Sequence, residues 1–268
     1  MPNYNIIKEE YLSNRTITLN YLASKYNISP STISKNLKKM GVIIRSGNAK
    51  FNCNENYFSV IDSADKAYFL GLMGADGQVQ GSKMRIDLNS DDIHILESFK
   101  LYLESEHQIH TYQTNNTTRP YSRLVIGSEK LCKDLAKYNV VPNKTFIFTF
   151  PSIPSEYYFH FIRGYFDGDG CLTRTKSTNK YLMSILGTKE LLQKIQSILG
   201  LEHITLIQRF PERNNNNYTL QICGNQQIIK LLDMIYQESD DSIRLARKHL
   251  LFLELKNNSK SHSPSFSK

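Results

Sequence analysis

Two aspartates end two similar segments of the sequence. The segments AYFLGLMGADG (67–77) and HFIRGYFDGDG (160–170) are apolar stretches typical of helices, and each closes on a small residue followed by Asp-Gly. Asp76 and Asp169 therefore stand near the C-terminus of a helix, where a negative charge is electrostatically unfavourable. Carboxylate oxygens are ligands that Mg²⁺ prefers, and a bound metal ion can activate water and stabilise charge on a phosphate. The two acids are the first candidates for chemistry.

The helices that carry these acids must lie close together if the carboxylates are to share a site. Gly71 and Ala75 are four positions apart in the first segment, as are Gly164 and Gly168 in the second. Residues at this spacing lie on one helix face, and small residues there let two helix backbones touch. We therefore expect the two helices to pack directly against each other.

The similarity between the two halves continues downstream of the acids. A strand entering a helix is expected for 84–103 and for 182–201, and again for 121–135 and 218–232. Each half therefore predicts a helix, two strands, a helix, two strands and a helix. An internal repeat of this kind indicates a duplicated structural unit.

The segments FLGLMGADG (69–77) and IRGYFDGDG (162–170) resemble the two LAGLIDADG motifs of single-chain homing endonucleases, and the resemblance covers about residues 57–256. It implies an α+β fold of two pseudo-symmetric LAGLIDADG repeats, with helices over curved antiparallel sheets, plus a small all-α helix-turn-helix domain. It also implies a metal-dependent endodeoxyribonuclease that cuts both strands of a specific DNA site with Mg²⁺ or Mn²⁺. We expect a monomer, since one chain supplies both motifs.

The resemblance also assigns roles to individual residues. It implies that Asp76 and Asp169 are catalytic and bind the metal ion, together with the adjacent Gly77 and Gly170. The basic residues near the scissile phosphates in this family match the lysines of PNKTF (142–146) and ARKHL (246–250), although these could be ordinary surface lysines. These candidate catalytic lysines are Lys144 and Lys248.

Two sets of positions depart from the family pattern. The sixth motif position is Gly74 in the first half and Asp167 in the second, and it varies within the family. At the end of the second strand of each half, other members carry Gln or Lys, whereas this sequence has Asn89 and Gly187–Thr188. We expect at least one accessory polar contact to be missing for this reason.

The N-terminus predicts a separate DNA-binding module. Residues 19–41 predict two short amphipathic helices, with Ser29-Pro30 opening the second, as in a helix-turn-helix. Residues 1–50 hold eight Lys/Arg against two acids, so most of the net charge of +8 lies there, which favours an anionic partner. The alternative is a helical hairpin that packs on the main domain. The expected DNA contacts on the second helix are Ser31, Thr32, Lys35, Lys38 and Lys39.

Polar loops and strand ends supply the other expected DNA contacts. The stretches 114–123, 173–181 and 209–218 are rich in Arg, Lys, Asn and Thr, which are the residue types that contact base edges. Ordinary solvated loops are the alternative. The candidate residues are Arg119, Arg123, Arg174, Lys176, Arg209 and Arg213.

These patterns divide the chain into five segments. They are a helix-turn-helix module (1–46), a linker (47–56), LAGLIDADG repeat 1 (57–150), LAGLIDADG repeat 2 (151–256) and a disordered tail (257–268).

Composition narrows the remaining possibilities. Apolar content is 40%, and no apolar run has the roughly 20 residues that a membrane span needs. The four cysteines form no C-x-x-C pair, so neither a zinc site nor a disulfide framework is indicated. We expect a free-standing protein in the cytoplasm of a bacterial or phage-infected cell, with double-stranded DNA as partner. The alternatives are a transcription regulator and a maturase that binds intron RNA.

Overall fold

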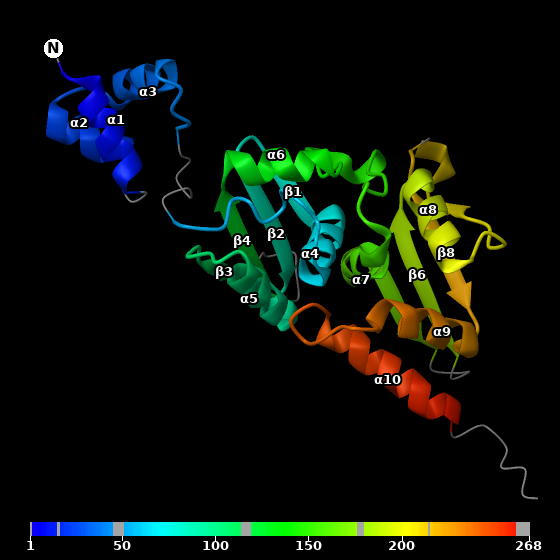
Figure 1. The fold of residues 1–268 in the computed structure, drawn as a ribbon. Coiled ribbons are helices and arrows are strands. Elements are labelled where there is room, and N and C mark those ends of the chain that lie inside the picture. Colours follow the sequence, from blue (N-terminus) through cyan, green and yellow to red (C-terminus); the bar gives the residue numbers. More distant parts are fainter. Residues whose placement is uncertain are drawn as a thin grey trace, which may run out of the picture.

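The computed structural model describes residues 2–14, 17–44, 51–113, 119–175, 180–213 and 215–260, and its main body consists of two halves with the same order of elements (Figure 1). The first half comprises α4 (Ala64–Ala75), β1 (Gly77–Gln80), β2 (Lys83–Asn89), α5 (Ile93–Tyr102), β3 (Ile109–Tyr112), β4 (Tyr121–Gly127) and α6 (Glu129–Lys137). The second comprises α7 (Tyr158–Asp169), β5 (Gly170–Arg174), β6 (Tyr181–Gly187), α8 (Lys189–Leu199), β7 (Ile207–Gln208), β8 (Tyr218–Cys223) and α9 (Asn225–Tyr236). The predicted α+β fold of two repeats is confirmed.

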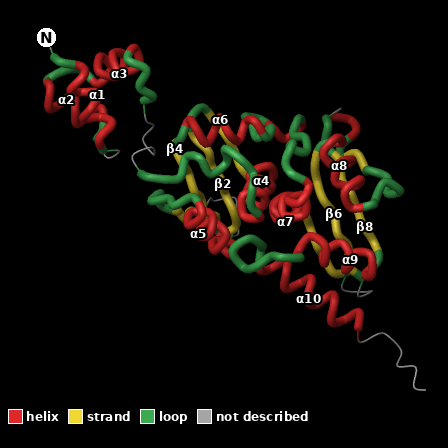
Figure 2. Tube along the Cα trace, viewed as in Figure 1, coloured by secondary structure: helices red, strands yellow, loops and turns green. Residues whose placement is uncertain are grey.

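Each half contains a four-stranded antiparallel sheet. The strand orders are β1-β2-β4-β3 and β5-β6-β8-β7, and the two sheets lie on either side of α4 and α7 (Figure 2). Side chains alternate along each strand: in β2, Met84 and Ile86 are buried, whereas Arg85 and Asp87 lie on the opposite face and are partly exposed. Each sheet therefore has one face in the apolar core and one polar face open to solvent.

The two central helices touch through their glycines. A Cβ atom on Gly71 would lie 2.1 Å from the carbonyl oxygen of Phe161, and one on Gly164 would lie 1.9 Å from that of Tyr68. Gly168 is packed against Ala75 in the same way, at 2.3 Å between its ideal Cβ and the Cβ of Ala75. The backbones of α4 and α7 are thus in direct contact, as the small-residue spacing predicts.

The C-terminal segment ties the second half to the first. Helix α10 (Ala246–Lys260) begins beside α5, where Arg247 pairs with the buried Asp92 at 2.9 Å. The hydroxyl groups of Ser242 and Tyr102 are also within hydrogen-bond distance, at 3.0 Å. Because α10 continues to Lys260, residues 257–260 of the expected disordered tail are helical, and residues 261–268 lie outside the described ranges.

Three helices form the N-terminal module: α1 (Tyr4–Ser13), α2 (Leu19–Tyr26) and α3 (Pro30–Lys39). Helix α3 begins as predicted, with Ser29 as N-cap accepting a hydrogen bond from the Thr32 amide at 3.2 Å and with Pro30 at its first position. Helix α1 was not predicted, although its Ile7 and Tyr11 are buried in the module. The small core consists of Ile7, Tyr11, Leu22, Ile33, Leu37 and Val42.

The connection between the module and the body is shorter than the predicted linker. Residues 45–50 lie outside the described part of the chain, but Asn52 is already bonded to Glu106, with its amide 2.9 Å from the carboxylate. The Asn54 amide donates to the Leu103 carbonyl oxygen at 2.7 Å. The second part of the linker expected over 47–56 is therefore attached to the first half of the body.

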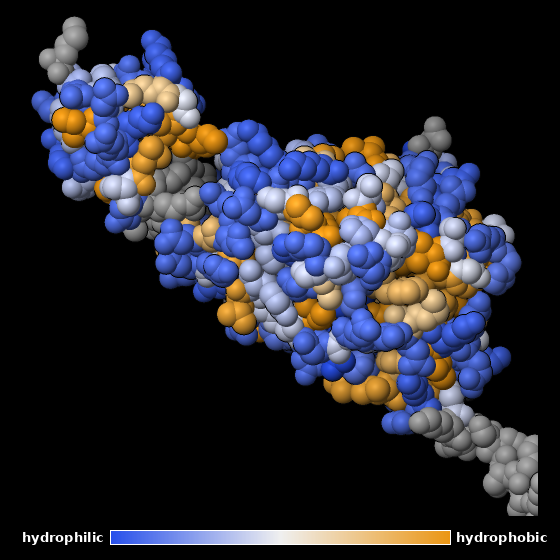
Figure 3. Space-filling model, in the orientation of Figure 1, coloured by the Kyte–Doolittle hydropathy of each residue, from blue (hydrophilic) through white to orange (hydrophobic). Residues whose placement is uncertain are grey.

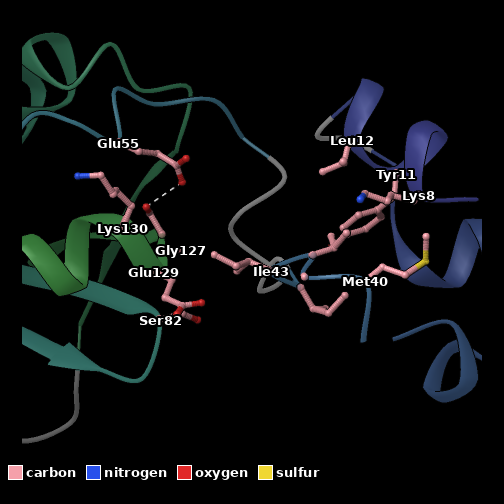
Figure 4. Close-up of a pocket in the computed structure, with 14 residues that line it drawn as sticks. Lys8, Tyr11, Leu12, Met40, Ile43, Glu55, Ser82, Gly127, Glu129 and Lys130 are labelled. Atoms are coloured by element: carbon pink, nitrogen blue, oxygen red, sulfur yellow. Dashed lines mark hydrogen bonds between the residues drawn. The ribbon is translucent and has the colours of Figure 1, made fainter. Parts of the chain in front are cut away.

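A hollow of about 510 Å³ separates the module from the body (Figure 4). Leu12 and Ile43 line it from the module, and their exposed fractions of 58% and 59% show that the body does not bury them. Glu55 and Glu129 line it from the body. Figure 3 likewise shows apolar residues on the side of the module that faces the body. Among the described residues, the apolar core of the module is therefore separate from that of the body.

None of the described helices is both long enough and apolar enough to cross a membrane.

The glycine contacts predict the effect of a single methyl group. We expect Gly71→Ala and Gly164→Ala each to lower the free energy of unfolding by about 3 kcal/mol or more, because the new Cβ would meet a backbone oxygen that cannot move independently. Chemical denaturation would measure this. Gly200→Ala is the control: it meets no atom within 4 Å and suffers only from its φ of +68°, which costs about 1 kcal/mol. A loss at Gly71 no larger than that at Gly200 would contradict the close packing.

Candidate active site

Asp76 and Asp169 lie together where α4 and α7 end. Asp76 is the C-cap of α4, and Asp169 is the last residue of α7. A Cβ on Gly168 would lie 3.1 Å from the Oδ2 atom of Asp76, so the carboxylate of the first half is next to the backbone that leads into Asp169. The contact between the glycines thus determines the distance between the two acids.

The environment of the acids opposes their ionisation. Burial and, to a smaller extent, the neighbouring charge of Asp169 raise the pKa of Asp76 to about 6, although Lys248 and Lys144 act in the opposite direction. Burial also raises the pKa of Asp169, against the lowering effects of Lys144 and of a hydrogen bond with Tyr165. A cation between the two carboxylates would relieve both the desolvation and the repulsion.

A buried lysine caps each of the two helices. The Lys144 Nζ donates to the carbonyl oxygens of Ala75 at 3.0 Å and Gly77 at 2.7 Å. The ammonium group neutralises a helix end that carries both the negative pole of the helix dipole and an acid. Only 8% of Lys144 is exposed, which excludes the reading of an ordinary surface lysine.

Lys248 makes the equivalent contacts in the second half and one more. Its Nζ donates to the carbonyl oxygens of Phe166, Asp167 and Gly170, at 2.6, 2.7 and 2.6 Å. Burial lowers the pKa of Lys248 to about 8. An ammonium group has three N–H donors, so the contacts of Lys248 use all of them, whereas the two contacts of Lys144 leave one.

The donor set favours the carboxylates over the glycine carbonyls as metal ligands. The carbonyl oxygens of Gly77 and Gly170 each accept a hydrogen bond from a buried ammonium group, which would repel a cation. Within the described ranges, no group of three or more His, Cys, Asp or Glu residues could hold a metal ion. The two carboxylates offer hard oxygen ligands of the kind that Mg²⁺ prefers and leave room for oxygens from a substrate.

The variable motif position has a structural role in the second half. Asp167 is buried and accepts hydrogen bonds from the Tyr68 hydroxyl at 2.9 Å and from the Leu245 amide at 2.8 Å. Its equivalent, Gly74, faces the ring of Phe148, which a Cβ there would approach to 2.5 Å. The same position is thus filled by a polar network in one half and by an aromatic ring in the other.

Arg163 is a buried structural residue behind the site that the sequence did not single out. It is fully buried and donates to the carbonyl oxygens of Ile243 at 2.8 Å and Ile235 at 2.9 Å. These bonds attach α7 to the segment that leads into α10 and Lys248. A signal was present, because a charged residue inside an apolar helix must find buried partners.

Two of the positions that depart from the family pattern, Asn89 and Thr188, serve as helix caps. Asn89 accepts a hydrogen bond from the Asp91 amide at 3.0 Å, at the start of the 3₁₀ turn Ser90–Asp92. Thr188 is the N-cap of α8 and donates to the Phe148 carbonyl oxygen at 2.6 Å. Neither side chain is part of the acid site.

The arginines predicted to contact DNA are spread over both halves and are partly engaged. Arg119 pairs with Asp91, and Arg174 pairs with Glu254 of α10. Arg209 and Arg213 both lie over the ring of Phe210, next to the 3₁₀ turn Pro211–Arg213. Lys176 lies outside the described residues. Arg123 is on the open face of the first sheet, where it pairs with Asp87.

In the module, the predicted contact residues lie on one helix. Ser31, Thr32, Lys35, Lys38 and Lys39 are all exposed on α3, while Ile33 and Leu37 of the same helix are buried.

A family model described as a LAGLIDADG-like domain matches residues 63–138 and 156–236, which together are more than half of the chain. The two matched ranges contain α4 with Asp76 and α7 with Asp169. The chain belongs to the LAGLIDADG-like domain family.

Comparison with solved structures shows the same fold. The LAGLIDADG homing endonuclease I-GzeII, in complex with its DNA target, matches with a TM-score of 0.51 at 13% identity, covering 74% of this chain and 93% of that one. The meganuclease I-SmaMI, bound to an uncleaveable DNA, matches with a TM-score of 0.50 at 12% identity, covering 73% and 90%. At such low identity, this likeness establishes the architecture alone.

A curated relative is similar over a limited stretch. Reverse gyrase of Methanocaldococcus jannaschii is 27% identical over 197 residues, which make up 70% of this chain and 11% of that protein. The chain thus spans about a ninth of the length of this relative.

Proposed function

We propose that the chain is a site-specific endonuclease that cuts both strands of a DNA duplex by hydrolysis, with Mg²⁺ or Mn²⁺ as cofactor. The observation that carries the proposal is the meeting of Asp76 and Asp169 at the ends of two touching helices, each helix capped by a buried lysine. A transcription regulator or an RNA maturase would not need this costly pair of acids.

Each half of the protein would supply the catalytic groups for cleavage of one DNA strand. Each half supplies one carboxylate and one lysine, related by the approximate two-fold relation between the repeats, which matches the symmetry of a duplex backbone. Asp76 and Asp169 would hold the metal ion, which would supply activation of water and neutralisation of charge on the scissile phosphate. Lys144 and Lys248 fix the helix ends, and the remaining donor of Lys144 is available to a phosphate oxygen. One chain suffices for both cuts, so we propose that the enzyme acts as a monomer.

The nuclease proposal is tested by removing one carboxylate at a time. We expect Asp76→Asn and Asp169→Asn to slow double-strand cleavage at least about 100-fold, because a bound metal ion would lower the activation barrier by several kcal/mol. The substrate is a plasmid that carries the insertion-less allele of the DNA around the gene, incubated with Mg²⁺. Binding measured in EDTA should change little.

Asp62→Asn is the matched control, since this exposed acid pairs with Lys66 at the opposite end of α4 and should leave cleavage unchanged. Specific binding by the wild-type chain without any Mg²⁺-dependent cleavage would refute the nuclease and favour a regulator.

We further propose that residues 1–46 form a helix-turn-helix module that lengthens the DNA footprint. Helix α3 presents Lys35, Lys38 and Lys39 to solvent, and lysines on such a helix suit phosphate contacts. The hollow between module and body leaves Leu12 and Ile43, among the described residues, without apolar packing against the body. The undescribed connection of six residues, 45–50, can span at most about 20 Å, so the module would reach DNA immediately beside the body.

Removing the positive charge of α3 tests the module. We expect the triple variant Lys35→Ala, Lys38→Ala, Lys39→Ala to shorten the footprint and to reduce the slope of log affinity against log salt by up to about 3, roughly one for each lost phosphate contact. Footprinting and salt titration measure the two effects, and the cut positions should not move.

A control removes the same charge from helices that cover the sheets, with alanine at Lys133, Lys194 and Lys230. An identical footprint and slope for the α3 variant and the wild-type chain would show that the module does not contact DNA.

A further inference from the structure

The open faces of the two sheets can be compared position by position. In the first sheet, Ile86 of β2 pairs with Gly77 of β1 and with Leu124 of β4. In the second sheet, Ile185 of β6 pairs in the same way with Gly170 of β5 and with Leu220 of β8. The neighbouring outward positions are therefore equivalent. They match Gln78 with Cys171, Arg85 with Ser184, Asp87 with Leu186, Arg123 with Thr219, and Val125 with Gln221.

The first sheet carries two arginines that form ion pairs with one carboxylate, and Arg123 also donates hydrogen bonds to it. The Arg123 Nε lies 2.5 Å from Oδ1 of Asp87, and the Arg85 Nε lies 3.0 Å from Oδ2 of the same residue. The terminal nitrogens of both guanidinium groups also form hydrogen bonds: Arg85 donates to the Gln78 side chain at 2.5 Å, and Arg123 donates to the Tyr112 hydroxyl at 2.8 Å. The two guanidinium groups thus stand in set positions on the open face.

The second sheet has no such pair among its described residues. Ser184, Leu186 and Thr219 occupy the equivalent positions and line a hollow of about 410 Å³ together with Asp169. Arg209 enters this hollow from the loop after β7. The two open faces therefore differ in chemistry, although their backbones are related by the repeat. The first carries an arginine–carboxylate cluster, whereas the second has neutral side chains at the equivalent positions, around a hollow that Asp169 and Arg209 also line.

We propose that Arg85 and Arg123 are specificity-determining residues that read guanines in one half of the DNA target, with Asp87 as their positioning residue. The inference rests on the proposed function. A guanidinium group has five N–H donors, and the contacts named above leave some of them for a base edge. Arginine is the residue that most often contacts the O6 and N7 atoms of guanine in the major groove. A side chain already held in place loses less entropy when it binds.

The second half of the target is read differently. Ser184 and Thr219 offer single hydroxyl groups and Leu186 offers an apolar contact, which suits a thymine methyl group better than a guanine edge. The nearly symmetric protein therefore recognises an asymmetric site: the guanines read by Arg85 and Arg123 lie in the half under the first sheet and have no counterparts at the equivalent positions of the other half.

The test is selection from a randomised duplex library by the full-length protein in EDTA, with sequencing of the bound DNA. For the wild-type chain we expect required guanines in one half of the site, with no such requirement at the equivalent positions of the other half. Arg85→Ala and Arg123→Ala should each reduce the preference for one guanine by between about 5-fold and 150-fold, the range of a bidentate contact. Ser184→Ala and Thr219→Ala, at the equivalent positions, should affect only the other half.

Asp87→Asn separates positioning from charge. In Asp87→Asn, loss of the negative charge should strengthen binding to all sequences. Loss of the ion pairs that position Arg85 and Arg123 should also relax the guanine preference. Asp87→Glu keeps the charge and should retain the guanine preference that Asp87→Asn loses. If both arginine variants lost affinity equally for every sequence, the residues would be phosphate contacts and this inference would fall, while the proposed function would stand. Absence of any sequence-dependent binding by the wild-type chain would instead overturn the proposed function.

Discussion

The contact between the backbones of α4 and α7 is the constraint on which the rest of the structure depends. Gly71 and Gly164 allow each helix to touch the carbonyl oxygens of the other, and no other residue type fits there. Because both helices end in an acid, this contact brings two carboxylates together and places the two sheets on opposite sides of one axis. The site, the repeat symmetry and the orientation of the two open sheet faces follow from it.

Two acids at adjacent helix C-termini are unfavourable, and the surrounding residues offset that cost. Lys144 and Lys248 each insert an ammonium group among the carbonyl oxygens of a helix end. Arg163 and Asp167 then attach α7 to the segment that delivers Lys248. A site whose acids remain difficult to ionise, with raised pKa values, is suited to bind a cation together with a phosphate.

The fold was predictable from the sequence because the same order of helices and strands is expected in both halves, so each half strengthens the prediction for the other. Asp76, Asp169 and the glycine spacing were recognisable from local pattern, and the start of α3 followed from Ser29-Pro30. The pairing of Arg123 with Asp87 was not predictable, because it depends on the register between strands that are about 35 residues apart in the chain. Helix α1 has a weak apolar periodicity and becomes a helix through its packing in the module, so it was missed for a related reason.

The claim that the two carboxylates share one site is tested most directly by a double-mutant cycle in the metal-free protein, with Asp76→Asn and Asp169→Asn. The folded pKa of Asp76 lies above its value in an unfolded chain, so its ionisation costs stability above pH 6 and not below about pH 4. Each single variant should therefore unfold at higher denaturant concentration at pH 7.5. The double variant should gain less than the sum of the single gains, by at least about 0.5 kcal/mol, because either change removes the mutual repulsion. This difference should shrink toward pH 4.5. Fully additive gains at pH 7.5 would contradict a shared site.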